Sequence, residues 1–289
     1  MVIDKPIVIF DATCFLYIHG NKEDYKETVH SHMRDVLQNC DTNLYIGILD
    51  GKNNFRKQVA VTKEYKGQRK FEKPLYFYKI RDLLIKKYGF LVVDGMEADD
   101  LAVILAGRIN QMDSESLDIN SHYSVEAQYK AVIASIDKDL PQADGIHYNL
   151  KSHQKLIVSD DTCYIYLNDK KKIEATGYKS LYAQMLMGDS ADNIPGLPKY
   201  GPVKTYELLR DCDTRDKCKQ VVINEYMKVY PDDYQERIKE NFSLVYILRN
   251  HRDVGPIKVL TFRNNVPIKD ELTNKIDEEN EDIQVSIRT

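Results

Sequence analysis

Four short apolar segments, each followed within a few residues by acidic side chains, constrain the fold of this chain more than any other feature. The segments are Ile7–Phe10, Leu44–Leu49, Phe90–Val93 and Ala131–Ile136, and they are rich in branched residues. Such runs are typical of strands that are covered on both faces, as in a parallel sheet. Helix-like stretches separate them, so we predict an α/β fold with a mainly parallel central sheet flanked by helices.

Acidic residues stand where these predicted strands end. The positions are Asp11, Asp50, Glu97, Asp99, Asp100, Asp137 and Asp139. A single strand-end Asp is usually a turn residue, and acids also suit the first turn of a helix. Several in register are harder to explain in that way. Because parallel strands end along a common edge where active sites form, we expect these carboxylates to converge.

A second acidic pair lies in the stretch from Gly188 to Gly201. Asp189 and Asp192 are three residues apart, which puts both on one face if the turn is helical. A turn with glycines and prolines follows, and a helical run from Val203 to Leu209 comes next. A helix, turn and helix can be an ordinary interhelical loop, but it can also offer backbone N–H groups to a phosphate without reading bases.

Charge is segregated along the chain, although the net charge is only −4. Residues 52–87 hold twelve Lys and Arg against three acids, whereas residues 270–282 hold seven acids and one Lys. A basic segment can be a solvated helical face, but it is also the footprint of a phosphate-bearing partner. We therefore expect a nucleic acid to bind near residues 52–87.

The remaining patterns predict local structure. We expect a helix from Pro74 to Tyr88 with Leu75, Tyr78, Leu83 and Leu84 buried, a surface loop over 110–128, and an edge hairpin of Lys155–Val158 with Cys163–Leu167. The odd number of cysteines, five, lacks zinc or disulfide spacing and favours free thiols in a reducing cytoplasm, that of the host if the genome is viral. No apolar run approaches the length of a membrane span.

Seven stretches together resemble the 5′-nuclease superfamily, which includes phage 5′→3′ exonucleases, flap endonucleases and the 5′-nuclease domain of bacterial DNA polymerase I. They occur in the family's order, and the coupling of Glu97–Asp100 to Gly188–Gly196 is the most specific feature. The stretches are Phe10-Asp11, Leu49–Lys52, Phe55-Arg56, Glu64–Arg69, Glu97–Asp100, Asp137–Asp139 and Gly188–Gly196. The fold implied is PIN-like, with a C-terminal helical region that carries a helix-hairpin-helix.

The resemblance implies two divalent metal ions, Mg²⁺ with Mn²⁺ as a substitute. Oxygen ligands suit both ions, and we expect no His or Cys beside the acids. The first ion would be surrounded by Asp11, Asp50, Glu97 and Asp99, with Asp99 also counted as catalytic. Asp100 would lie between the two sites. The second site would be served by Asp137, Asp139, Asp189 and Asp192.

The resemblance also implies contacts to DNA. Lys66 and Arg69 match basic residues on an arch over the active site and would act in catalysis by holding the scissile phosphate. Tyr65, or another aromatic residue near the arch such as Phe71, would be placed to stack on a terminal base, although we favour a buried core role for it. The helix-hairpin-helix at 196–201 would grip duplex DNA and bind K⁺ through backbone carbonyls. The full set of predicted DNA contacts is Arg56, Tyr65, Lys66, Arg69, Lys70, Gly196, Lys199, Gly201 and Lys204.

The implied layout is an α/β catalytic domain at 1–170 with an arch segment at about 52–73, a helical DNA-binding region at 171–255, and an extension at 256–289 with an acidic end. We expect a monomeric 5′→3′ exonuclease with flap endonuclease or RNase H activity in phage replication or primer removal. Its partners would be duplex DNA with a 5′ end or flap, RNA–DNA hybrids and replication proteins, without a membrane. The alternatives are a PIN-type ribonuclease and a non-catalytic DNA-junction binder.

Overall fold

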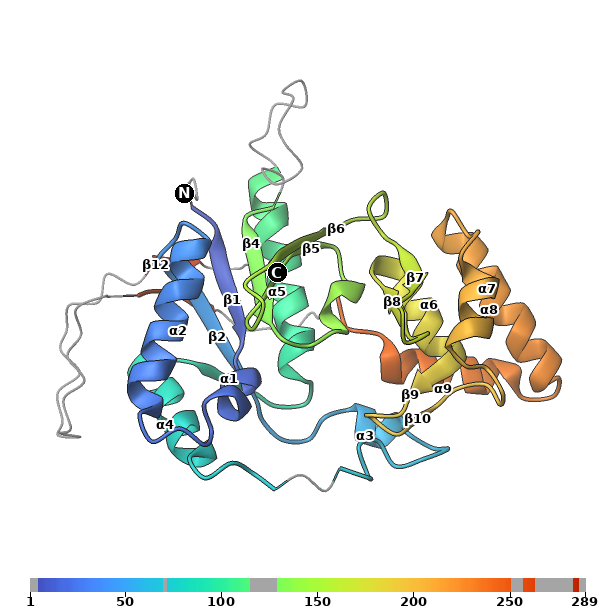
Figure 1. Cartoon of the computed structure of the whole chain (residues 1–289), viewed down its shortest axis with the longest axis horizontal. Helices are drawn as coiled ribbons and strands as arrows, with labels where there is room; N and C mark the ends of the chain where they lie inside the picture. The colour runs from blue at the N-terminus through green and yellow to red at the C-terminus, as the bar shows by residue number, and fades with distance from the viewer. Residues whose placement is uncertain (1–4, 70–71, 115–128, 251–256, 263–282, 286–289) are drawn as a thin grey trace.

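A parallel sheet forms the centre of the protein. The computed structural model describes residues 5–69, 72–114, 129–250, 257–262 and 283–285 (Figure 1). Strands β1 (Ile7–Asp11), β2 (Leu44–Asp50), β3 (Leu91–Val93) and β4 (Ala131–Ser135) run parallel in the spatial order β3-β2-β1-β4. The four strands predicted from the apolar segments are therefore confirmed, and their carboxyl ends share one edge.

Further strands extend this sheet at both sides. On one side β5 (Gly145–Asn149) lies parallel to β4, and β6 (Lys155–Val158) pairs antiparallel with β5. On the other side β11 (Ile257–Thr261) pairs antiparallel with the start of β2, and β12 (Ile283–Val285) pairs with β11. The sheet is thus mainly parallel with antiparallel strands at its margins.

Helices cover both faces of the sheet. One face packs on α1 (Thr13–Ile18), α2 (Tyr25–Asn39) and α4 (Phe77–Tyr88), and the other packs on α5 (Ala98–Ser114). Because neighbouring strand residues point to opposite faces, Val8 lies in the first of these two cores, whereas Ile9 lies in the second. The α/β fold expected from the sequence is confirmed.

A separate hydrophobic core holds a helical region beside the carboxyl edge of the sheet (Figure 1). Its helices are α6 (Gly177–Met187), α7 (Pro202–Leu209), α8 (Arg215–Val229) and α9 (Tyr234–Val245). Its smaller elements are α3 (Arg56–Val59), β7 (Ile165–Leu167), β8 (Ile173–Ala175), β9 (Gly188–Asp189) and β10 (Ile194–Pro195). The short helix η2 (Leu140–Gln142) packs through Leu140 in the sheet core that contains α5. None of the helices in the described ranges is long and apolar enough to cross a membrane.

The predicted edge hairpin was wrong in its pairing. Strand β6 pairs with β5, and β7 pairs with β8 in a two-stranded sheet of its own. Ile165 of β7 packs in the helical core, so a boundary at residue 170 cuts this hairpin in two. Helix α5 continues to Ser114, into the stretch predicted as loop, and 115–128 lie outside the described residues, as does the acidic stretch 270–282.

The turn after α6 depends on two glycines. Gly188 has a φ of +71°, and a Cβ on Gly196 would lie 2.1 Å from the carbonyl carbon of Met187. A side chain at either position would therefore push β9 and β10 apart. This close approach fixes the path of residues 189–195, which carry the second acidic pair.

Candidate active site

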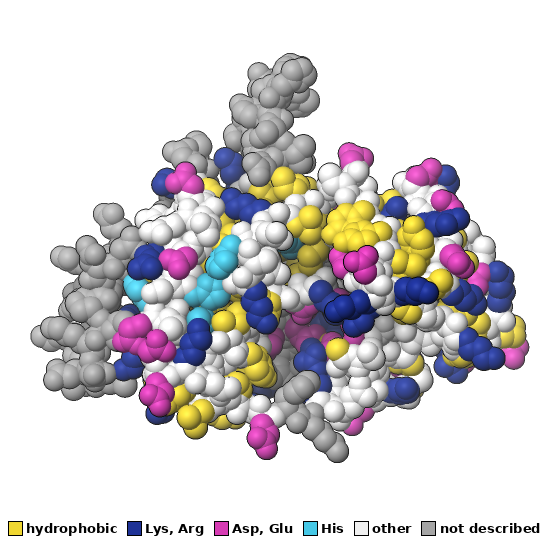
Figure 2. Space-filling model, viewed as in Figure 1, with side chains coloured by type: hydrophobic (Ala, Val, Ile, Leu, Met, Phe, Trp, Pro, Cys, Tyr) yellow, Lys and Arg dark blue, Asp and Glu magenta, His cyan; other side chains and the backbone are white. Residues whose placement is uncertain are grey.

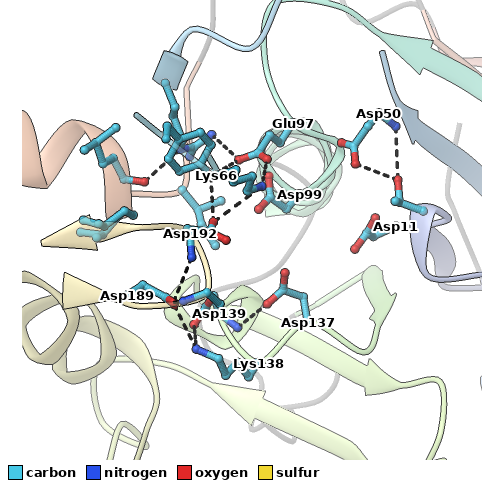
Figure 3. Close-up of a pocket in the computed structure, with 18 of the residues that line it drawn as sticks. Asp11, Asp50, Lys66, Glu97, Asp99, Asp137, Lys138, Asp139, Asp189 and Asp192 are labelled. Carbon is cyan, nitrogen blue, oxygen red and sulfur yellow. Dashed lines mark hydrogen bonds and ion pairs between the residues drawn. The ribbon is translucent and has the colours of Figure 1, made fainter. Parts of the chain in front are cut away.

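One cavity of about 430 Å³ gathers most of the predicted acids. Figure 2 shows acidic side chains inside a hollow at the middle of the molecule, with basic side chains at its rim. Eight of the nine predicted metal ligands line this cavity, and Figure 3 shows their carboxylates directed into a common space. They are Asp11, Asp50, Glu97, Asp99, Asp137, Asp139, Asp189 and Asp192.

Strand ends and a helix start position the first group of acids. Asp11 ends β1, Asp50 ends the neighbouring β2, and Asp99 lies in the first turn of α5. Asp50 is held at both oxygens, because Thr13 Oγ1 donates to one at 2.9 Å and the Ala98 N–H donates to the other at 2.8 Å. Parallel strand order and one helix start thus place these carboxylates side by side.

Asp11 lies in a buried corner of the cavity. Burial, together with the charge of Asp50, raises its pKa to about 7. Ser135 Oγ donates to Asp11 at 2.8 Å, and Cys14 Sγ lies 3.6 Å from the same oxygen. The expectation that no Cys accompanies the acids was therefore wrong. Burial raises the pKa of the Cys14 thiol, so it stays protonated and serves as a weak donor.

A second group of acids faces the first from the loop between β4 and η2 and from the turn after α6. Lys138 Nζ lies 3.2 Å from both Asp139 and Asp189, which joins the two elements. Gln184 of α6 donates to Asp139 at 2.5 Å. Burial raises the pKa of Asp139 to about 7, and the neighbouring Asp137 adds to the rise. Asp189 also accepts from the Ala191 N–H at 2.7 Å, which tightens the turn.

The segment between α3 and α4 lies across the turn after α6. Lys66 forms an ion pair with Glu97 and lies 3.6 Å from Asp192, while Arg69 pairs with Asp192. Both basic side chains line the cavity, as expected for groups that meet a phosphate. The backbone is fastened as well, because the Lys66 N–H donates to the Asp192 carbonyl at 2.8 Å.

Tyr65 is a buried core residue, which is the favoured one of the two roles expected from the sequence. Its side chain is buried in the helical core, and its hydroxyl donates to Glu97 at 2.8 Å and to Asp192 at 2.9 Å. The ring packs against protein because this segment lies on the turn that carries Asp192. Tyr65 therefore orients two of the cavity's carboxylates.

Asp100 and Arg56 form a buried ion pair outside the set of acids that lines the cavity. Arg56 donates to Asp100 through two nitrogens at 2.5 and 2.8 Å, and neither side chain is more than 2% exposed. Arg56 also donates to the carbonyls of Leu244 and Tyr246. Each group is saturated by protein partners in this structure, and the assignments of Asp100 to metal and of Arg56 to DNA stay predictions.

The predicted DNA contacts of the helix-hairpin-helix lie in the connection from α6 to α7 and in the first turn of α7. Gly201 caps α7 without a side chain, Lys199 is exposed with a φ of +67°, and Lys204 lies over the Tyr200 ring at 3.4 Å. Gly196 is used for close packing of the turn. None of these residues lines the cavity, and Lys70 lies outside the described residues.

The charge of the cavity favours cations. Its lining holds eight carboxylates and four basic side chains, and one of the four, Arg56, is paired with Asp100, which is not part of the lining. Two carboxylates about 4 Å apart repel by roughly 4 kcal/mol at an effective dielectric of 20. Within the described residues, no three side chains of the metal-binding types converge on one point. Lys66 and Lys138 lie between the acids, so divalent ions would have to displace or join them.

Sequence reasoning missed several residues that line or shape the cavity. Thr13 and Ser135 bind acids but have no distinguishing pattern, and Gln184 lies inside an apolar helix. Lys138 could have been found, because it stands between two predicted ligands. Tyr17 lines the cavity with half of its side chain exposed. Its position six residues after Asp11 is the one sequence feature that could have indicated a place near the site.

Known proteins share both the sequence and the fold. No protein-family profile matches the chain. A 5′-3′ exonuclease of Buchnera aphidicola subsp. Acyrthosiphon pisum is 33% identical over 223 residues, which are 70% of this chain and 68% of that protein. DNA polymerase I of Bacillus caldotenax is 24% identical over 283 residues, which are 92% of this chain but 29% of the polymerase.

Solved structures of one phage enzyme have the same fold. The T5 5′-exonuclease with bound divalent zinc ions aligns with a TM-score of 0.54 at 15% identity, over 83% of this chain and 99% of that one. The bacteriophage T5 flap endonuclease in complex with DNA and metal ions aligns with a TM-score of 0.53 at 14% identity, over the same shares. The sequence match covers two thirds of an exonuclease, and the structural match shows the same architecture. The chain therefore belongs to the 5′-nuclease superfamily of enzymes.

Proposed function

We propose that the chain is a metal-dependent 5′→3′ exonuclease that also cuts at 5′ flaps and removes RNA from RNA–DNA hybrids. One observation carries this proposal: eight carboxylates from distant parts of the chain line one cavity beside Lys66 and Arg69. A hard-oxygen donor set of this kind suits Mg²⁺ or Mn²⁺. The relatives named as exonucleases and the T5 complexes with metal ions and DNA support the same conclusion.

Bound divalent ions would supply an activated water and stabilise the developing charge on a phosphate. Asp11, Asp50, Glu97 and Asp99 would hold one ion. The second would be held by Asp137, Asp139, Asp189 and Asp192. Lys66 and Arg69 would bind the scissile phosphate, because both extend into the cavity from the segment that crosses it. Tyr17, half-exposed on the cavity wall, would contact the base next to that phosphate.

Duplex DNA would be held by the connection from α6 to α7. The N-terminus of α7 follows Gly201, with Lys199 and Lys204 exposed on either side. Backbone N–H groups and lysines at such a place bind phosphates without sequence preference. A K⁺ ion at the carbonyls of 196–201 is part of this proposal, and thallium-205 NMR of the protein with duplex DNA would test it.

The test is a cleavage assay with 5′-labelled blunt duplex, 5′-flap, RNA–DNA hybrid and single-stranded RNA, each in Mg²⁺, Mn²⁺ or EDTA. We expect mononucleotides or short oligonucleotides from the 5′ end of the first three substrates in either metal and none in EDTA. Cleavage of single-stranded RNA alone would assign the chain to the PIN-type ribonucleases. Binding without cleavage would make it a DNA-junction binder.

A further inference from the structure

We propose that an exposed patch of aromatic and basic side chains at the start of α4 binds the unpaired 5′ strand of the substrate. The patch consists of Lys73 and Leu75, which precede α4, and Tyr78 in its first turn. It lies over the buried Phe77 and continues onto Tyr17 of α1. This inference rests on the proposed function, since it names where a 5′ tail would lie outside the cavity. Figure 2 shows hydrophobic side chains over α1 and α4, to the lower left of the acidic hollow.

The patch exposes apolar surface that packing does not use. Leu75 is 77% exposed, Tyr78 is 64% exposed and Tyr17 is 50% exposed, although Tyr78 and Tyr17 belong to helices that pack on the sheet. These are among the most exposed large hydrophobic side chains in the described residues. Neighbouring exposed aromatic residues of this kind mark a binding surface more often than isolated ones do.

A lysine lies on the same rings. Lys73 Nζ is 4.8 Å from the centre of the Phe77 ring and 4.6 Å from that of Tyr78, and it donates to the Tyr78 hydroxyl at 2.7 Å. An ammonium group has three donors, so this one keeps capacity for a phosphate oxygen. The patch therefore combines a stacking face with a cation, which are the two features that proteins use to bind single-stranded nucleic acid.

The patch is held rigidly at its base. The Tyr76 N–H donates to the Gly20 carbonyl at 2.8 Å, and the Leu75 N–H donates to Asn21 Oδ1 at 3.2 Å. Tyr76 also stacks on Tyr25, with ring centres 5.1 Å apart. Because the backbone is already ordered, a ligand that binds here loses little free energy to ordering the protein.

Tyr17 connects the patch to the cavity. Its ring meets the Phe77 ring edge to face with centres 5.5 Å apart, and the same side chain lines the cavity of the acids. A strand whose phosphate lies among those acids can therefore continue over Tyr17 onto Tyr78 and Lys73. Residues 52–87 carry an excess of basic side chains, which would attract the negatively charged strand. A nucleic acid strand would use both the aromatic face and the cation, whereas an acidic or apolar protein segment would use only one of the two.

Equilibrium binding of labelled DNA tests the proposal. Fluorescence anisotropy in Ca²⁺ compares a blunt duplex with the same duplex that carries an unpaired 5′ tail of about ten nucleotides. We expect the tail to tighten binding to the wild-type protein, and we expect Tyr78→Ala and Lys73→Ala each to reduce that gain at least about fivefold. Blunt-duplex affinity should stay unchanged, and Tyr78→Phe, which keeps the ring, should retain the gain.

Tyr166→Ala is the matched control, because Tyr166 is 43% exposed on β7 in the helical region. The inference is wrong if Tyr78→Ala and Lys73→Ala keep the full tail-dependent gain, or if sedimentation velocity shows a dimer that Tyr78→Ala dissociates. Leu75→Glu, which adds a negative charge at an exposed position, should also weaken tail binding if the patch meets phosphates. A wild-type protein that cleaves no substrate would refute the proposed function instead, so the two failures are distinguishable.

Discussion

The ammonium of Lys66 forms an ion pair with the carboxylate of Glu97, which joins the segment between α3 and α4 to the start of α5. Burial opposes the charge of Lys66, but Glu97 and Asp192 outweigh it and raise the pKa of the lysine. Burial likewise opposes the charge of Glu97, and its ion pairs with Lys66 and Arg56 lower its pKa. Both groups are therefore charged at neutral pH, and the basic segment is tied electrostatically to the acidic cavity.

Lys66→Ala should slow cleavage far more than it weakens DNA binding. The ammonium would neutralise charge that develops on the phosphate, so we expect a loss on the order of 10²- to 10³-fold in the single-turnover rate. Affinity for a 5′-flap substrate in Ca²⁺ should fall by only a few-fold. Lys63→Ala, at an exposed lysine of the same segment, is the control and should change neither quantity. An equal loss in rate and affinity would show that Lys66 contributes to DNA binding and not to the cleavage step.

Asp99→Asn should abolish metal-supported cleavage without unfolding the protein. Burial, together with Asp100 and Glu97, raises the pKa of Asp99, so the charged form is unfavourable in the cavity without a cation. We expect a rate loss on the order of 10³-fold or more and retained duplex binding in Ca²⁺. The melting temperature in EDTA should equal or exceed that of the wild type. Asp161→Asn, at an exposed acid of another loop, is the control, and wild-type turnover by Asp99→Asn would refute the assignment.

Asp100→Asn should instead destabilise the fold. It leaves Arg56 without its main partner in a site where both side chains are at most 2% exposed. Breaking a buried pair in this way costs about 3–5 kcal/mol, which denaturant unfolding would measure. The double variant Arg56→Met with Asp100→Leu removes both charges and should recover much of that loss. If Asp100→Asn matches Asp99→Asn in stability, Asp100 belongs with the cavity acids.

The contrast between Asp99 and Asp100 shows where prediction from sequence stops. Adjacent residues of a helix point about 100° apart, and of these two neighbouring acids only Asp99 lines the cavity. The sequence does not say which of them faces inward, because the partner that decides it, Arg56, lies 44 residues away. The convergence of Asp11 and Asp50 was easier to predict, since parallel strands force it.

Helix α4 shows the same limit for packing. The helix begins at Phe77 and not at the predicted Pro74. Burial of Leu84 is confirmed and Leu83 is partly buried, but Leu75 and Tyr78 are exposed. The other buried residues are Phe77, Ile80 and Tyr88. The stretch carries apolar residues on two sides, so periodicity alone does not select the face that packs. When a helix has apolar residues on one side for the core and on another side for a ligand, hydrophobic periodicity does not tell the two sides apart. The exposed apolar side is the one that we assign to the 5′ strand.

The pH dependence of stability gives the last prediction. Burial raises the pKa of Asp11 and of Asp139 to about 7, from an ordinary value of 3.8. Above pH 4 the folded protein therefore holds protons that the unfolded chain has released. Stability from these groups is fully present below about pH 4 and is lost as the pH rises through 7. In EDTA we expect the melting temperature to fall between pH 6.5 and pH 8.5.

This window avoids the buried imidazoles. Burial lowers the pKa of His19 to about 3 and that of His147 to about 4, so these groups destabilise the protein only below about pH 6.5. Asp11→Asn removes one of the carboxyl groups whose pKa is raised and should weaken the pH dependence measured in EDTA, whereas Asp161→Asn should not. With Mg²⁺ the trend should flatten or reverse, because the ion favours ionised carboxylates. An unchanged slope in Asp11→Asn would mean that Asp11 is already ionised in the folded protein at pH 6.5, and that the cavity tolerates its charge.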